Sequence, residues 1–486
     1  MHQLLFLSAH ELALLIKERK ATSCDIVRAH LDHIKKHNSK INAMISVYEE
    51  EALELAKVRD VQVRENEILG PLHGVPVTVK EMFWVKDTPS TVNAEKFKDF
   101  VAPEDGTVVK RIKESGAIII GKTNLAHMVM DYSANGEIYP RGNNPYNESL
   151  TPGGSTGGGA AAVAAGFTPI ELGSDIAGSC RAPANFCGVY GLKPTEGTIP
   201  LHGMFPFDEG DKGPILNMGV LGPLGRDPYD LELMWKIIRG PSSSERFIAP
   251  VQYDEKDRNS LDEFRIGYTV NWADYPISKQ TEQRLCGYVD TLRKNGVTVK
   301  ELEIPKELID QSIELWFSLF PYTTATDLPE QVREIVKNSY KEGVFKGYRT
   351  QFEEFDRGFQ MDATHYAEVI NKRYWVVSEW EDILAKYDFL ISPISYGPAY
   401  RHTKPGNPIR TETGDIPYAE YQFPFVACFN GTGHPAMNIP IGNDPNGLPI
   451  GIQIVGRYWS ESILLKFAQL AKQLSSNLQK PSGYKV

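Results

Sequence analysis

The stretch that most constrains this chain runs from Thr151 to Thr195 and contains two serines framed by glycines. Ser155 lies in GGSTGGG and Ser179 lies in SDIAGSC, with small residues and a short apolar run between them. Glycines beside a hydroxyl permit backbone angles closed to other residues and leave amide N–H groups free to face a ligand. Two such sites in one short segment indicate that the backbone takes part in chemistry or approaches another group closely. GGSTGGG taken alone fits a glycine hinge equally well.

The composition favours a large globular enzyme over a nucleic-acid-binding protein. The chain has 486 residues, of which 41% are hydrophobic and 10% aromatic, so a full core is expected. The net charge is −10, and the charged residues form no long run of one sign. Binding to nucleic-acid phosphates requires a basic face instead. Helical and strand patterns alternate without an internal repeat, which predicts one large layered α/β domain over residues 1–486.

The cysteines and the N-terminus predict a soluble, cytoplasmic protein. An odd number of scattered cysteines gives no disulfide framework and fits a reducing compartment: Cys24, Cys180, Cys187, Cys286 and Cys428. Cys180 and Cys187 are interpreted as packed thiols. The N-terminal residues predict a capped amphipathic helix from Ser8 instead of a signal peptide. No run reaches the about 18 apolar residues of a transmembrane segment.

Three stretches away from the two serines also carry structural predictions. The pattern VPVTV predicts a buried strand that ends on Lys80, although a surface lysine with its stem along apolar groups is the simpler interpretation. Residues at about 305–386 are helical and aromatic and predict an excursion that covers one side of a sheet. Its aromatic side chains are expected in the core more often than in a pocket: Trp316, Phe317, Phe320, Tyr374, Trp375 and Trp380. The Gly- and Pro-rich residues 201–227 predict loop and turn.

Two apparent ligand motifs are rejected. His30, His33 and His37 share one helix face, but the neighbouring lysines favour a solvated face over a zinc site. Residues 116–123, GAIIIGKT, match the P-loop pattern. A P-loop needs a flexible loop between its glycines, and here those residues are themselves the predicted strand, so nucleotide binding is disfavoured.

The residues around Ser179 point to acyl transfer. If Asp175 to Gly178 form a tight turn, their N–H groups face the space beside the Ser179 hydroxyl and form an oxyanion hole. No GxSxG elbow is present, so no local pattern supplies a histidine base. A lysine that burial keeps neutral is the alternative base. Lys80 is the best candidate, with Ser155 placed to relay the proton.

Three segments together resemble the amidase signature family. They are GVPVTVKE, TPGGSTGGGAAAVAAGF and GSDIAGSCRAPANFCGVYGLKPT, in the family's order and with its 24-residue spacing between the two serines. IIIGKTNL, NNPYN, GVLGPLGRD and HPAMNIPIG are also similar, so the resemblance covers nearly the whole chain. It implies a single α/β/α sandwich with a large mixed central β-sheet covered by helices, and no metal or cofactor.

The resemblance also implies a role for each motif residue. Ser179 would be the acyl-forming nucleophile, and Ser155 the bridging serine, held by a cis peptide bond. Lys80 would be the general base and then the acid that protonates the leaving amine. Because Lys80 must be neutral, activity is expected to rise toward alkaline pH. The oxyanion hole would be formed by the amides of Ile176, Ala177, Gly178 and Ser179.

The chain departs from the family pattern at two positions near the serines. Many members have serine where Thr156 stands, and threonine keeps the hydroxyl. Many have glycine where Ala177 stands, and a methyl group is tolerable there if the backbone angles are ordinary. Asp175 and Arg181 flank Ser179 and are interpreted as a pair that holds the loop, in preference to a direct electrostatic role.

The family includes simple aliphatic and aryl amidases, fatty-acid amide hydrolases, peptide amidases and the A subunit of tRNA-dependent amidotransferases. This chain lacks the run such as YGLVAFASSLDQIGP that follows GLKPT in the A subunit, and it resembles that subunit poorly at 421–427. We therefore favour a serine amidohydrolase that cleaves a carboxylic acid amide to an acid and an amine or ammonia. The glutamine-hydrolysing A subunit is the alternative, and a catalytically silent scaffold is disfavoured.

Substrate and partners are constrained only in class. A small-molecule amide is the expected partner, with no nucleic acid, and a homodimer stays open. The aromatic residues 316–380, with residues 128–139, are hypothesised to line an apolar acyl channel. Acyl and amine specificity stay open among short aliphatic, aryl and fatty acyl amides.

Overall fold

A mixed β-sheet of eleven strands runs through the molecule in a computed structural model that describes residues 4–205, 217–251, 258–325, 330–348, 352–475 and 478–484. The strand order is β1-β3-β2-β4-β6-β5-β12-β13-β9-β7-β8. The bounds are β1 (Met44–Val47), β2 (Pro76–Lys80), β3 (Ile118–Thr123), β4 (Ile170–Asp175), β5 (Tyr190–Lys193), β6 (Val220–Gly225), β7 (Arg265–Tyr268), β8 (Thr298–Glu301), β9 (Phe389–Ser392), β12 (Ala436–Asn443) and β13 (Pro449–Val455).

The sheet combines parallel pairs toward its two ends with antiparallel pairs in its middle, and β1 is antiparallel to β3 at one edge. β2 is parallel to β3 and β4, and β7 is parallel to β8 and β9. β6, β5, β12 and β13 form an antiparallel middle. Every residue of β2, β3, β4, β6 and β12 is buried, which requires covering layers on both faces.

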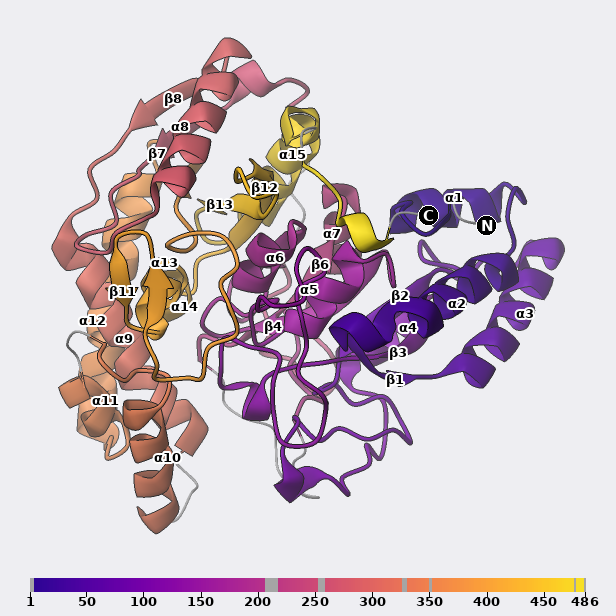
Figure 1. Ribbon diagram of the computed structural model, residues 1–486, viewed down its shortest axis with the longest axis horizontal. Helices are drawn as coiled ribbons and strands as arrows, with labels where there is room; N and C mark the ends of the chain where they lie inside the picture. The colour runs from indigo at the N-terminus through magenta and orange to yellow at the C-terminus, as the bar shows by residue number, and fades with distance from the viewer. Residues whose placement is uncertain are drawn as a thin grey trace.

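Helices supply both layers, and the apolar residues of the sheet pack against them. One core cluster takes apolar residues from α1 (Ala9–Lys17), α4 (Thr107–Glu114), α7 (Pro228–Ile238), α8 (Lys279–Lys294) and α15 (Glu461–Ala471). Another takes them from α2 (Ser23–Ile41), α3 (Glu49–Glu65), α5 (Gly157–Ala164) and α6 (Arg181–Cys187). Figure 1 shows β8 and α8 at one end of the sheet and β1, α2 and α3 at the other. The α/β sandwich with a mixed sheet is confirmed.

The aromatic stretch folds into helices beside the sheet (Figure 1). These are α9 (Lys306–Ala325), α10 (Glu330–Glu342), α11 (Phe352–Gly358) and α12 (Ala363–Leu384), while 326–329 and 349–351 lie outside the described residues. They pack with the short α13 (Phe423–Val426) and α14 (Cys428–Gly431), near the hairpin of β10 (Ile409–Thr411) and β11 (Gly414–Ile416).

The predicted core aromatics divide into two groups. Trp316, Phe317, Phe320 and Trp380 are buried, and the rings of Trp316 and Phe320 stack with their centroids 4.4 Å apart. Two neighbours in sequence differ from the prediction: Tyr374 is 72% exposed and Trp375 is 69% exposed. They lie on the outward face of α12, which aromatic density along the sequence does not reveal.

Three further predictions are tested by the fold. Ser8 caps α1 through a capping box, as expected. The loop predicted at 201–227 is wrong at β6, whose hydrogen-bonding partners β4 and β5 override its Gly and Pro content; residues 206–216 lie outside the described residues. The solvated face predicted for the histidines is wrong as well, since His30 and His33 are buried and contact backbone carbonyls.

Candidate active site

Lys80 ends a central strand inside the protein, without exposed surface. Its Nζ donates hydrogen bonds to Ser155 Oγ at 2.8 Å and to Ser174 Oγ at 2.9 Å. Burial lowers the pKa of Lys80 to about 7, although the charges of nearby acidic groups oppose the shift. The amine can therefore accept a proton near neutral pH, which a surface lysine cannot do.

Ser155 lies between Lys80 and Ser179. The Gly154–Ser155 peptide bond is cis, as the resemblance implied. Ser155 Oγ donates to Ser179 Oγ at 3.0 Å, so a continuous chain of hydrogen bonds joins the amine to the second serine. The following helix α5 approaches β3 closely: a Cβ on Gly158 would lie 2.4 Å from the backbone nitrogen of Asn124. The glycines after Ser155 thus allow α5 to pack against the sheet.

Ser179 lies in the loop between β4 and α6, where 5% of its surface is exposed. Within the described residues, the backbone amides of Ile176, Ala177 and Ser179 make no hydrogen bond. These three amides can therefore serve an oxyanion. Ala177 has no positive φ, so the methyl group at this departure from the family pattern is accommodated without strain.

Gly178 differs from the prediction. Its N–H donates to Asp175 Oδ1 at 2.8 Å, so this amide is occupied and is not available to an oxyanion. The reason is the turn itself, which brings the Asp175 carboxylate under the loop. Gly178 has a φ of +90°, and a Cβ there would lie 2.4 Å from Val426 Cγ2. Glycine is required at this position for the turn and not for a free amide.

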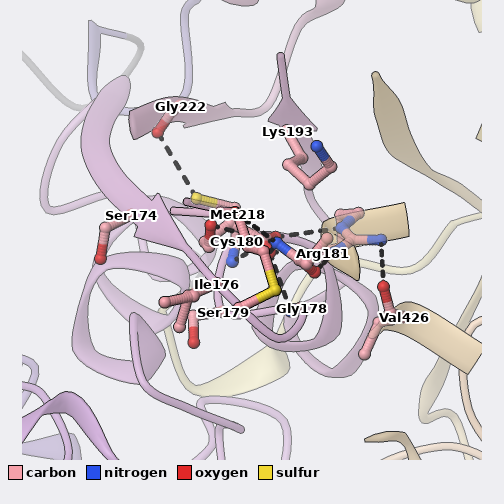
Figure 2. A network of polar contacts seen from close by, with 12 residues as sticks. Ser174, Ile176, Gly178, Ser179, Cys180, Arg181, Lys193, Met218, Gly222 and Val426 are labelled. Atoms are coloured by element: carbon pink, nitrogen blue, oxygen red, sulfur yellow. Dashed lines mark hydrogen bonds and ion pairs between the residues drawn. The ribbon is translucent and has the colours of Figure 1, made fainter. Parts of the chain in front are cut away.

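Asp175 and Arg181 form a fully buried ion pair beneath the loop. Arg181 Nη2 donates to Asp175 Oδ1 at 2.9 Å, and Nε donates to Oδ2 at 3.0 Å. Burial acts to raise the pKa of Asp175, but Arg181 outweighs it and holds this pKa well below its usual range. Arg181 also donates to Asn430 Oδ1 at 2.6 Å and to Gln453 Oε1 at 2.5 Å. Figure 2 shows the Arg181 guanidinium directed toward Val426, away from the Ser179 hydroxyl, in agreement with a loop-holding role.

Sequence reasoning missed two residues that support the site. Ser174 is the second acceptor of Lys80, and its hydroxyl also contacts Met82 Sδ at 3.2 Å. Trp316 Nε1 donates to the carbonyl of Ile176 at 2.7 Å and anchors the free amides. Of these residues, only Ser174 could have been found from the sequence, because it directly precedes Asp175 in the serine motif. Thr156, which the sequence analysis placed next to the bridging serine, contacts Ser179 through the backbone. Its N–H donates to the Ser179 carbonyl at 3.3 Å.

A cavity opens onto Ser179, and most of its lining is apolar. Met128, Val129 and Met130 come from one of the two stretches proposed for an acyl channel, and Phe320 comes from the other. The rest of the described lining is Met82, Ser174, Asp175, Ile176, Ser179, Met204, Phe205, Gly219, Val220 and Thr324. Among these described residues there is no lysine, arginine or histidine, and the one carboxylate is paired with Arg181.

The described residues contain no group of three or more His, Cys, Asp or Glu side chains placed to hold a metal ion. None of the helices in the described part of the chain combines the length and apolar character that a membrane crossing requires.

Comparison with known proteins identifies the family. A family model described as Amidase matches residues 25–465. The chain belongs to the amidase family. This confirms the resemblance seen in the sequence, and it makes the chain an enzyme that acts on carbon–nitrogen amide bonds.

The relatives of this chain carry names of more than one activity. The A subunit of glutamyl-tRNA(Gln) amidotransferase from Clostridium botulinum (strain Eklund 17B / Type B) is 30% identical over 486 residues, covering 96% of each chain. A protein of the same name from Thermotoga maritima has a similar solved structure, with a TM-score of 0.77, 24% identity and 98% of each chain covered. A 6-aminohexanoate cyclic dimer hydrolase has a TM-score of 0.80 and 24% identity, with 99% of this chain and 100% of that chain covered. The structural matches establish the fold.

Proposed function

We propose that this amidase hydrolyses a carboxamide through an acyl-enzyme on Ser179. The observation that carries the proposal is the buried chain from Lys80 Nζ through Ser155 Oγ to Ser179 Oγ, with contacts of 2.8 and 3.0 Å. Neutral Lys80 takes the proton of Ser155 as Ser155 takes that of Ser179, and Ser179 Oγ attacks the carbonyl carbon. The amides of Ile176, Ala177 and Ser179 hold the resulting oxyanion.

The same proton completes the reaction. When the tetrahedral intermediate collapses, the C–N bond breaks and Lys80 returns the proton through Ser155 to the leaving nitrogen. Water then repeats the attack on the ester carbonyl, with Lys80 again as base, and releases the acid and the free serine. All proton transfers use groups of this chain.

The cavity favours an apolar acyl group. Its described lining consists mainly of methionine, valine, isoleucine and phenylalanine side chains, and methionine adapts to irregular shapes. The α-ammonium and α-carboxylate groups of an amino acid would find no unpaired opposite charge among the described lining residues. We therefore propose an amide with an aliphatic or aryl acyl chain as the substrate.

The names of the curated relatives favour a second candidate, the glutamine-hydrolysing A subunit of an amidotransferase. Relatives with amidotransferase names are 26 to 30% identical over nearly the full length. This is evidence for the alternative that the sequence alone disfavoured, and the relatives support it better than a general amidase. The names of these relatives refer to a tRNA and to a subunit of a larger enzyme. They therefore do not support a small molecule as the only partner of this chain. For location, we propose the cytoplasm, because all five cysteines are unpaired thiols.

Ammonia release from hexanamide, benzamide and glutamine by the purified chain distinguishes the candidates. The apolar cavity predicts a kcat/KM about 100-fold higher for the apolar amides than for glutamine, because glutamine must lose the hydration of two charges. Acetamide serves as the control for amide chemistry without an acyl chain. A preference for glutamine, or copurification with partner subunits that raise glutamine turnover, would replace the first candidate by the second.

A further inference from the structure

A second buried titratable group, Glu171, lies on the same face of the sheet as Lys80. Thr78 pairs with Glu171 between β2 and β4, and Lys80 pairs with Thr123 between β2 and β3. Paired residues face the same side of a sheet, and so do residues two apart in one strand. Thr123 Oγ1 donates to Glu171 Oε1 at 2.6 Å. The Glu171 side chain therefore reaches across β2, the strand that carries Lys80.

The surroundings of Glu171 exclude water. The residue has no exposed surface, and a Cβ on Gly159 of α5 would lie 2.6 Å from its Oε1. Within the described residues, Oε2 makes no hydrogen bond of normal geometry. Burial raises the pKa of Glu171 to about 8, against the hydrogen bond from Thr123, the nearby Thr78 hydroxyl and the charge of Lys80. The carboxyl group is thus mainly protonated at neutral pH and ionises slightly above it.

The other titratable groups near this pair keep their charge in that range. Burial holds the pKa of the Cys180 thiol well above its usual value, so it stays neutral. Asp175 stays ionised because of Arg181. α5 packs against Glu171 with glycine, alanine and valine only, and Leu224 is its neighbour on β6. Glu171 is therefore the neighbour of Lys80 whose charge changes where Lys80 itself titrates.

We propose that Glu171 is a positioning residue that sets the proton affinity of Lys80, an inference that rests on the proposed role of Lys80 as the base. An un-ionised Glu171 leaves the Lys80 amine neutral and able to take the Ser155 proton. An ionised Glu171 favours the Lys80 ammonium, which cannot take that proton. The charges of the two groups act on each other, so their titrations are coupled.

The pH dependence of Ser179 labelling by a fluorophosphonate tests this proposal. Glu171→Gln keeps the shape and the acceptor for Thr123 but cannot ionise. Its labelling rate is expected to rise along a single titration curve, with a midpoint about one pH unit below that of the unchanged chain and a similar plateau. A purely structural role would change the rate without moving the midpoint. An unchanged or higher midpoint would overturn the proposal.

Two further variants keep the outcome interpretable. If Lys80→Met labels as fast as the unchanged chain, the proposed function fails; if Lys80→Met is slow and Glu171→Gln keeps the original midpoint, only the role of Glu171 fails. Should Glu171→Gln not fold, Thr123→Val tests the same point, because losing its hydrogen bond disfavours the carboxylate. It is expected to move the midpoint in the same direction by a smaller amount, and no movement would contradict the coupling.

Discussion

Replacing Lys80 by methionine is expected to lower the acylation rate of Ser179 by about 10⁴-fold and to stabilise the fold at pH 7 by about 2 kcal/mol. The rate falls because, in the part of the chain that the structure describes, no other group contacts the Ser155 hydroxyl as a base. The fold gains because the native chain holds Lys80 with a pKa of about 7, whereas an unfolded lysine stays charged up to its ordinary pKa of 10.5. Losing the hydrogen bonds to Ser155 and Ser174 offsets part of this gain.

The stability gain in Lys80→Met should depend on pH. Folding removes a proton from Lys80 at pH 7, so this residue destabilises the native state most at and below its folded pKa, and the cost disappears as the pH approaches 10.5. Denaturant unfolding should therefore show the gain at pH 7 and little of it near pH 10. Lys122 is the matched control. It is buried, with its pKa lowered to about 8, and it donates to the carbonyl of Pro89 instead of to the serines. Lys122→Met should leave acylation within about tenfold, and a tenfold or smaller loss in Lys80→Met would contradict the assignment.

Replacing Arg181 by methionine is expected to destabilise the chain by about 3–5 kcal/mol, because it leaves the Asp175 carboxylate buried and unpaired. Both side chains have no exposed surface, and Arg181 also donates hydrogen bonds to Gln453 on β13 and to Asn430 on α14. The loss should shrink as the pH falls toward 4, where the unpaired Asp175 takes up a proton. Unfolding midpoints in urea at the two pH values measure both effects.

A double variant separates the ion pair from packing. Asp175→Asn together with Arg181→Met removes both charges and is expected to recover part of the stability that Arg181→Met loses. The acylation rate should stay low in both variants, since Asp175 also binds the amides of Gly178 and Cys180 and so shapes the loop. A single Arg181→Met variant as stable as the unchanged chain would contradict a buried, ionised Asp175.

The central part of the site could be predicted because its signals are local. A run of β-branched residues between turn residues marks a buried strand, and Lys80 follows that run directly as the last residue of the strand. Glycines on both sides of Ser155, and Gly178 directly before Ser179, mark the two serines as residues in tight backbone turns. The family resemblance then assigned them different roles, which the hydrogen bonds from Lys80 to Ser155 and from Ser155 to Ser179 fit.

The remaining features depend on contacts between distant segments. Trp316 reaches the carbonyl of Ile176 from a helix 140 residues away, and no spacing in the sequence indicates this pair. Nothing local distinguishes Glu171 within its strand; only the register, which pairs it with Thr78, two residues from Lys80, links it to the base. β6 contains glycine and proline, so its local pattern is that of a loop, and only its pairing with two neighbouring strands makes it a strand.

Covalent labelling by a fluorophosphonate, located by peptide mass spectrometry, tests most directly whether Ser179 is the nucleophile and Lys80 its base. We expect one label per chain, on Ser179, absent in Ser179→Ala and slowed in both Lys80→Met and Ser155→Ala. Lys122→Met is the control and should label at close to the rate of the unchanged chain, since this buried lysine donates to the carbonyl of Pro89 instead of to the serines. Label on another residue, or labelling of Ser179 at an unchanged rate without the Lys80 amine, would contradict the mechanism.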